Sequence, residues 1–225
     1  MTSTQQQTLL NKMAVYHPHY GDRLATHLPM VLTALYKLGA SEERLQDSFK
    51  RGIQGLVRVN TGASPQPIED IQHYLGRGQS HKFSPGIIVD RMDEIALKLR
   101  ASGLVVQPES LTLEGIKQVC LIAYTAQNDF TLLHTVTGCH ALSKLLAYIK
   151  DKQSALRSFW QAIVVAYLST GLAFVESCDT STIVLDDVTS LKQKAILSTD
   201  SHVIKLVHTC LDEFENYGEP LYLYL

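Results

Sequence analysis

Three segments far apart in the chain each carry a histidine at or inside a stretch whose pattern predicts a helix. They read THLPM around His27, FTLLHTVTG around His134 and DSHVIKL around His202, and the last adds Lys205 one turn after its histidine. Three imidazoles and one amine brought together by a helical fold could converge on a metal ion. The chain has no glycine-rich phosphate loop, no nucleophile elbow and no zinc-type cysteine pair, so the histidines carry the strongest chemical hypothesis.

His27 is followed two positions later by Pro29, which suits the first turn of a helix. A proline also disfavours helical dihedrals in the residue before it, so we expect His27 to lie just ahead of the helix start. The alternative is a histidine that only caps the helix or lies satisfied at the edge of the core.

His134 lies inside a predicted helix and shares its face with small residues. With 3.6 residues per turn, that face holds Phe130, Thr137, Gly138 and Ala141. A glycine within a helix costs about 0.8–1 kcal/mol relative to alanine, so Gly138 could leave room beside the imidazole. Packing of another helix against Gly138 explains the glycine nearly as well.

Lys205 lies three residues after His202 and therefore shares its helix face. It also lies near the predicted helix start, where the helix dipole disfavours a cation. If burial lowers its pKa, the free amine can react with carbon dioxide to give a carbamate, an anion suited to a metal. The alternative is a surface lysine whose stem covers apolar neighbours.

The other histidines receive no role from their sequence context. His140 points about a third of a turn away from His134, toward a more polar face, and is left out of the site. His17 and His19 flank a proline in a predicted turn, where solvated imidazoles are usual. The remaining three, without a partner pattern, are His73, His81 and His208.

Length and composition indicate a globular protein with a sizeable core, in one large domain or two small ones. The chain has 225 residues, of which 45% are hydrophobic and 19% charged. Its formal charge of −2 gives no indication of binding to nucleic acid or to an anionic membrane. The longest apolar run, residues 162–168, is too short to span a membrane. Four scattered cysteines without a signal peptide predict reduced thiols in a cytoplasmic protein.

Apolar residues recur at helical spacing almost throughout, which predicts an all-α fold of about eight to ten helices in a single domain, residues 1–225. The first fifteen residues, with a polar start, are expected to be frayed. A short apolar run at 182–185 could be a strand, but it lacks a partner. The predicted helices cover residues 28–38, 42 to about 50 or 54, 84–103, 109 or 110–125, 130–150, 151–169, 186–197 and 201–217.

These segments resemble the questin oxidase-like family over residues 16–49, 129–171 and 200–206. The resemblance implies oxidative cleavage of polycyclic aromatic or quinone-like molecules, by Baeyer–Villiger-type or iron-dependent oxygenation, with NADPH as an external reductant. One branch of the family holds non-haem iron with four histidines and a carboxylated lysine. By motif, the resemblance implies His27, His134, His202 and Lys205 as metal ligands.

The chain departs from this family in its middle, which looks shortened. No histidine lies between His81 and His134, so we expect a metal shell that lacks a fourth imidazole. We also expect an apolar groove beside Phe130 and Trp160 that a second copy covers, giving a homodimer. Residues that could line a substrate cavity, or simply fill the core, are Phe130, Trp160, Tyr167 and Leu206.

Two function classes follow. The first is a non-haem iron monooxygenase or dioxygenase that acts on a small aromatic molecule. The second is a catalytically impaired relative that binds a hydrophobic ligand or a partner subunit.

Overall fold

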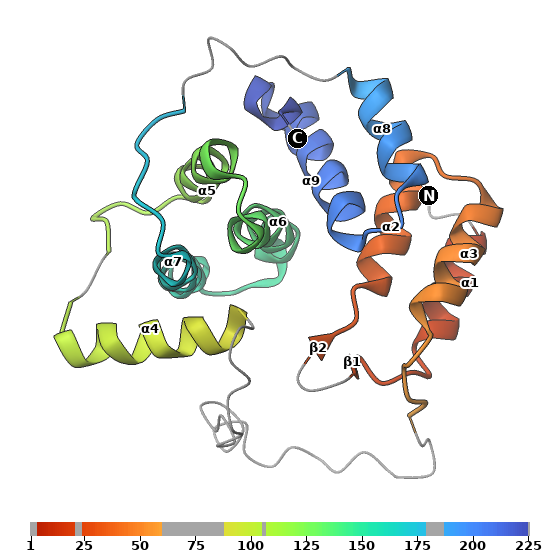
Figure 1. Cartoon of the computed structure of the whole chain (residues 1–225), viewed down its shortest axis with the longest axis horizontal. Helices are drawn as coiled ribbons and strands as arrows, with labels where there is room; N and C mark the ends of the chain where they lie inside the picture. Colours follow the sequence, from red (N-terminus) through yellow and green to blue (C-terminus); the bar gives the residue numbers. More distant parts are fainter. Residues whose placement is uncertain (1–3, 21–23, 60–87, 105–106, 179–186, 225) are drawn as a thin grey trace.

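The chain is built almost wholly from α-helices, as predicted (Figure 1). The structure, a computed structural model, describes residues 4–20, 24–59, 88–104, 107–178 and 187–224. Within these residues the helices are α1 (Thr4–Met13), α2 (Leu28–Leu38), α3 (Glu42–Gly52), α4 (Ile88–Ser102), α5 (Leu113–Gln127), α6 (Phe130–Leu145), α7 (Lys152–Thr170), α8 (Val188–Leu197) and α9 (Ser201–Tyr217). Shorter elements are the hairpin β1 (His19–Tyr20) and β2 (Leu24–Ala25) and the 3-10 helices η2 (Leu146–Tyr148) and η3 (Pro220–Leu223).

Local capping sets several helix ends where the sequence predicts them. The Ser41 hydroxyl accepts from the backbone N–H of Arg44 at the start of α3, and the Asp200 carboxylate accepts from the N–H of His202 at the start of α9. Helices α2 and α9 end at Gly39 and Gly218, whose φ angles of 89° and 69° favour glycine.

Three expectations need correction. The start is not frayed to residue 15, because α1 buries Leu9 against α2 and α3. Helix α5 begins at Leu113 rather than at residue 109 or 110, since the Thr112 hydroxyl caps it. Helix α6 ends at Leu145 and continues only as η2, short of residue 150. The possible strand at 182–185 and the predicted helix start at residue 84 lie outside the described residues.

Helix α9 connects the two halves of the molecule. In Figure 1 it lies between the group α5, α6 and α7 and the group α1, α2 and α3. Leu206 and Cys210 of α9 pack with α5, α6 and α7, Ile204 packs with α1, α2 and α3, and Val207 packs with α8. Because the apolar face of α9 packs against both halves of the molecule, it holds α2 and α6 in fixed positions beside its own first turns.

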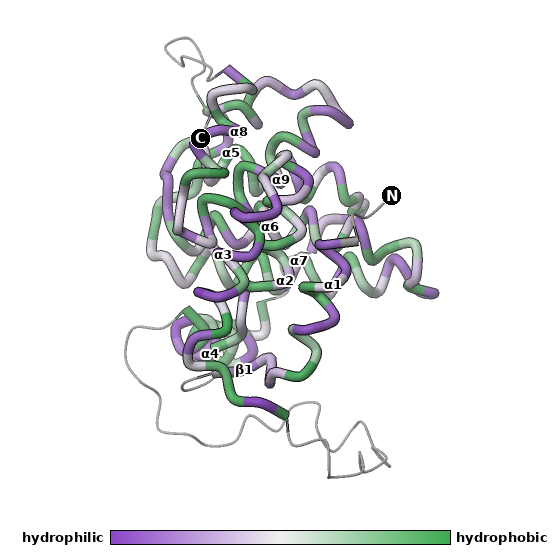
Figure 2. The backbone as a smooth tube through the Cα atoms, turned by 90° about the vertical axis from the view of Figure 1, so that its right-hand side faces the viewer, coloured by the Kyte–Doolittle hydropathy of each residue, from purple (hydrophilic) through white to green (hydrophobic). Residues whose placement is uncertain are grey.

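Hydrophobic segments run along the helices that pack in the interior, whereas the outer helices carry more hydrophilic stretches (Figure 2). Among the described residues, no helix combines the length and the apolar character needed to cross a membrane.

Candidate metal centre

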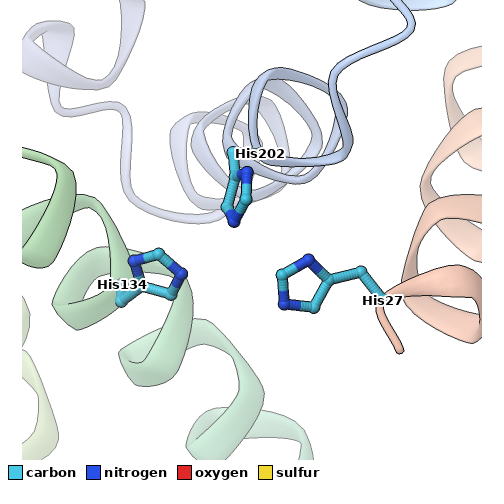
Figure 3. Close-up of side chains that lie close together, drawn as sticks. All are labelled: His27, His134 and His202. Atoms are coloured by element: carbon cyan, nitrogen blue, oxygen red, sulfur yellow. The ribbon is translucent and has the colours of Figure 1, made fainter. Parts of the chain in front are cut away.

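Helices α2, α6 and α9 bring the three predicted histidines into one cluster. One ring nitrogen from each of His27, His134 and His202 lies within 4.8 Å of the corresponding nitrogen of the other two. The ring centroids of His202 lie 4.9 Å from His27 and 5.1 Å from His134. Figure 3 shows the rings directed toward a common space, so the geometry permits one ion to contact all three.

Each histidine occupies the beginning of its helix. His27 is the N-cap residue of α2, directly before the first turn that contains Pro29, which agrees with the prediction from sequence. His202 is the second residue of α9, and His134 lies one turn into α6. Because α2 and α6 both pack against α9, three segments meet at one place, although His27 and His134 are 107 positions apart and His134 and His202 are 68 positions apart.

The Nδ1 atom of each ring lies within hydrogen-bond distance of a polar group of the protein. His134 Nδ1–H donates to the carbonyl oxygen of Phe130 at 2.7 Å, and His202 Nδ1 lies 3.2 Å from a carboxylate oxygen of Asp200. His27 Nδ1 lies 3.2 Å from the hydroxyl of Ser201. A carbonyl or carboxylate partner requires the proton on Nδ1, which leaves the Nε2 lone pair of His134 and His202 free for a metal.

The surroundings favour neutral imidazoles. Burial, followed by the charge of Lys205 and the other two histidines, lowers the pKa of His27 to about 4. Burial also lowers the pKa of His134, although its hydrogen bond to the Phe130 carbonyl opposes the change. Since a metal binds only the unprotonated ring nitrogen, these residues are ready to bind at neutral pH.

Lys205 is buried beside this cluster and is not a surface residue. Its side chain is 4% exposed, and burial lowers its pKa, while Asp200 opposes the shift. Its positive charge contributes to the lowered pKa of both His27 and His134. Within the described part of the chain, no hydrogen bond or ion pair neutralises it.

Of the predicted lining residues, Phe130 contacts the cluster. Its ring packs edge-on against His134 and His202, at centroid distances of 4.8 and 4.7 Å, and is 51% exposed. The other three candidates, Trp160, Tyr167 and Leu206, pack in the core between α5, α6 and α7.

Gly138 serves helix packing and not the space beside His134. A Cβ atom at this position would stand 3.4 Å from the ring of Phe159 on α7. The glycine therefore allows α6 and α7 to approach, which is the alternative explanation given for it above.

His140 stands outside the cluster, but its surroundings differ from the polar face that the sequence predicts. It is buried, and its Nδ1 lies 3.0 Å from the carboxylate of Glu213, which also accepts from Lys117 Nζ at 2.7 Å. The ring of His208 lies 5.5 Å from that of His140. The sequence does not reveal this network, because Lys117, His140 and Glu213 come from three separate helices.

The sequence did not indicate a part in the site for Asp200 and Ser201, whose side chains contact His202 and His27. The sequence Asp-Ser-His could have indicated the contact of Asp200 with His202, because an N-cap carboxylate folds back toward the second residue of its helix. The exposed His17 and His19 form a local contact, with the His19 N–H donating to His17 Nδ1, whereas His73 and His81 lie outside the described residues.

The fold and the cluster define an all-α protein with a candidate three-histidine metal centre. Residues 107–210 match the family described as questin oxidase-like, which is consistent with a member of that family and confirms the resemblance. The match contains His134, His202 and Lys205 but not His27. The family points to an oxidoreductase in general terms. No curated protein and no solved structure gives a significant match.

Proposed function

We propose that this protein is a non-haem iron oxygenase that acts on a polycyclic aromatic or quinone-like small molecule. The convergence of His27, His134 and His202, with ring nitrogens within 4.8 Å of one another, is the observation that supports this proposal. The family match supports the oxidoreductase class, and the metal and the substrate are our inference.

The chemistry of the donor set fits iron. Neutral imidazoles suit iron, zinc and copper, and three ligands on one side of an ion leave positions open for dioxygen and substrate. Lys205 lies beside these ligands, and the resemblance implies that it joins them as a carbamate. A carbamate would supply the anionic oxygen that the cluster otherwise lacks, since the carboxylate of Asp200 is engaged with His202.

The residues of this chain would position the reaction. Iron(II), when bound, supplies the ability to activate dioxygen for attack on an electron-rich ring. Phe130, Ser201 and Asp200 keep the three rings in place through the contacts described above. The half-exposed ring of Phe130 also covers two of the imidazoles and limits the access of water to them. NADPH as external reductant and a homodimeric assembly are further parts of the proposal.

No fourth histidine joins the cluster among the described residues. A shell with three imidazoles, expected from the short middle of the chain, is part of the proposal. We therefore expect weaker retention of metal than in a shell with four imidazoles, because each protein ligand adds a directed bond and orders the others.

Metal analysis of protein purified without oxygen and reconstituted with iron(II) tests the proposal. We expect about one iron per chain in the wild type and in the exposed control His19→Ala, little in His134→Ala, and oxygen consumption with a hydroxylated aromatic or quinone substrate. Bound iron without oxygen consumption would instead support the catalytically impaired relative. If no iron, zinc or manganese binds, the metal-dependent proposal is wrong.

A further inference from the structure

A cleft of about 270 Å³ runs between α2, α6 and α9, one helical turn beyond the histidine cluster. Met30, Thr137 and Lys205, each three residues after a cluster histidine, line its near end, and His140 and His208 line its far end. Its other lining residues are Pro29, Thr33, Ala34, Ala141 and Thr209. The cleft therefore begins one helical turn from the candidate metal centre and reaches a second pair of histidines, although no histidine of the cluster lines it.

The walls of the cleft are largely apolar. Pro29, Met30, Ala34 and Ala141 offer hydrocarbon surface. Helix α2 and helix α6 each contribute a threonine whose hydroxyl donates to a carbonyl oxygen of its own helix, Thr33 to Pro29 and Thr137 to Leu133. These threonines present mainly their methyl groups, so the body of a ligand held here would be apolar.

His208 provides a polar group at the far end. No described residue forms a hydrogen bond with its ring, although His140 lies against it in an edge-on contact. Burial and the neighbouring His140 lower the pKa of His208 to about 4, so the ring is neutral and offers one donor and one acceptor. A half-buried imidazole with both positions open would gain from a hydroxyl group of a ligand.

The length of the cleft limits the size of that ligand. His202 and His208 are six residues apart on α9, which corresponds to about 9 Å along the helix axis. Two fused aromatic rings with one hydroxyl group span this distance, whereas three rings in a row exceed it. The volume of about 270 Å³ also lies just below the range of ordinary ligand sites, which begins at about 300 Å³.

We propose that the cleft between α2, α6 and α9 binds a hydroxyarene of one or two rings, with its hydroxyl group on His208 and its other end toward the three-histidine cluster. His208 is then the residue that selects for the hydroxyl group. Naming this ligand as the substrate rests on the proposed function, but its binding does not require a metal.

Equilibrium binding of three probes to chelator-treated protein tests the inference. We expect 2-naphthol to bind at least tenfold more tightly than naphthalene and than the three-ring 2-anthrol. His208→Leu should weaken 2-naphthol at least tenfold and leave naphthalene unchanged, because it removes the polar group and keeps an apolar side chain. Ala141→Leu, which fills the cleft, should weaken both, whereas Ala147→Leu, an exposed alanine on η2 away from the cleft, should weaken neither.

Thermal melting of each variant establishes that it is folded. Equal affinity for 2-naphthol and naphthalene, or a response of both to His208→Leu, would overturn the role of His208, and tight binding of 2-anthrol would overturn the size limit. Binding of 2-naphthol by protein that takes up no iron would leave this inference standing and contradict the metal-dependent function. Iron uptake without 2-naphthol binding would contradict this inference and leave the metal-dependent function standing.

Discussion

His134 and His140 lie six residues apart on the same helix, yet the structure places them in different chemical surroundings. His134 faces two other imidazoles, and a backbone carbonyl accepts its Nδ1 proton. His140 faces the carboxylate of Glu213, which is itself paired with the buried Lys117. Around His134, neutral imidazoles that could bind a metal ion surround one space. Around His140, oppositely charged groups neutralise one another inside the core.

The role of each of these histidines therefore depends on which side chains from other helices lie beside it. Burial alone would raise the pKa of Glu213, but the hydrogen bonds from His140 and Lys117 hold it below its usual value. Among the described residues, His140 and His208 belong to no group of three side chains placed to hold a metal ion. The His140 network therefore stabilises the packing of α5, α6 and α9, whereas the three-histidine cluster is open to an ion.

The largest effect on stability should come from the carboxylate of the buried network. We expect Glu213→Ala to reduce the free energy of unfolding by about 3–5 kcal/mol, because it leaves Lys117 buried without a counterion. Denaturant unfolding measures the change, with Glu213→Gln as a milder variant. Lys117→Met combined with Glu213→Leu should recover most of the loss. A loss below about 1 kcal/mol for Glu213→Ala would mean that the network carries little stability.

Metal affinity should separate the two histidines of α6. His134→Ala removes a ligand and should weaken zinc or iron binding by at least about 100-fold, beyond the range typical of an outer partner. His140→Ala should lower the melting temperature and leave the metal content of the folded protein unchanged. Competition with a chelator gives the affinities. Equal losses in the two variants would show that the wrong histidine has been assigned to the centre.

The outer partner of His202 should have a smaller effect. Asp200→Asn keeps a good N-cap for α9 but removes the carboxylate that orients the ring, so we expect metal affinity to fall about tenfold. The free energy of unfolding should change by less than about 0.5 kcal/mol. Asp187→Asn, which changes the corresponding N-cap at the end of α8 remote from Asp200, is the matched control. An unchanged affinity in Asp200→Asn would show that this contact does not orient the ring.

The last prediction concerns the dependence of stability on pH. The folded pKa of His208 is about 4, below the ordinary 6.5, so the unfolded chain binds more protons and metal-free protein should lose stability as pH falls from about 6.5 to 4. One histidine contributes a slope of at most about 1.4 kcal/mol per pH unit. His140, Lys144 and Lys37 also face His208 and oppose its protonation, whereas Asp212 favours it. His208→Gln should flatten the unfolding curve in this window, and an identical slope would contradict the shift.

The sequence by itself determined the helices and several of their ends, because these depend on local interactions. Ser41 and Asp200 accept hydrogen bonds from residues two or three positions later, and Gly39 takes a conformation that other residues rarely adopt. The spacing of apolar residues likewise predicts the buried face of α2 without knowledge of its partners. The motifs also named the histidines that the structure brings together, through a resemblance to a family.

Only the tertiary structure decided how those residues meet. Whether His27 faces His134 depends on the packing of α2 and α6 against α9, and that contact joins residues far apart in the chain. The same packing places His140 against Glu213 in the interior, whereas the sequence predicted that His140 lies on a more polar face. It also places Phe159 against Gly138, where the sequence allowed open space beside the imidazole of His134. Helical periodicity gives the direction of a side chain around its own axis. Which residue a side chain then contacts depends on how the whole chain buries its apolar surface, and no local sequence pattern specifies this.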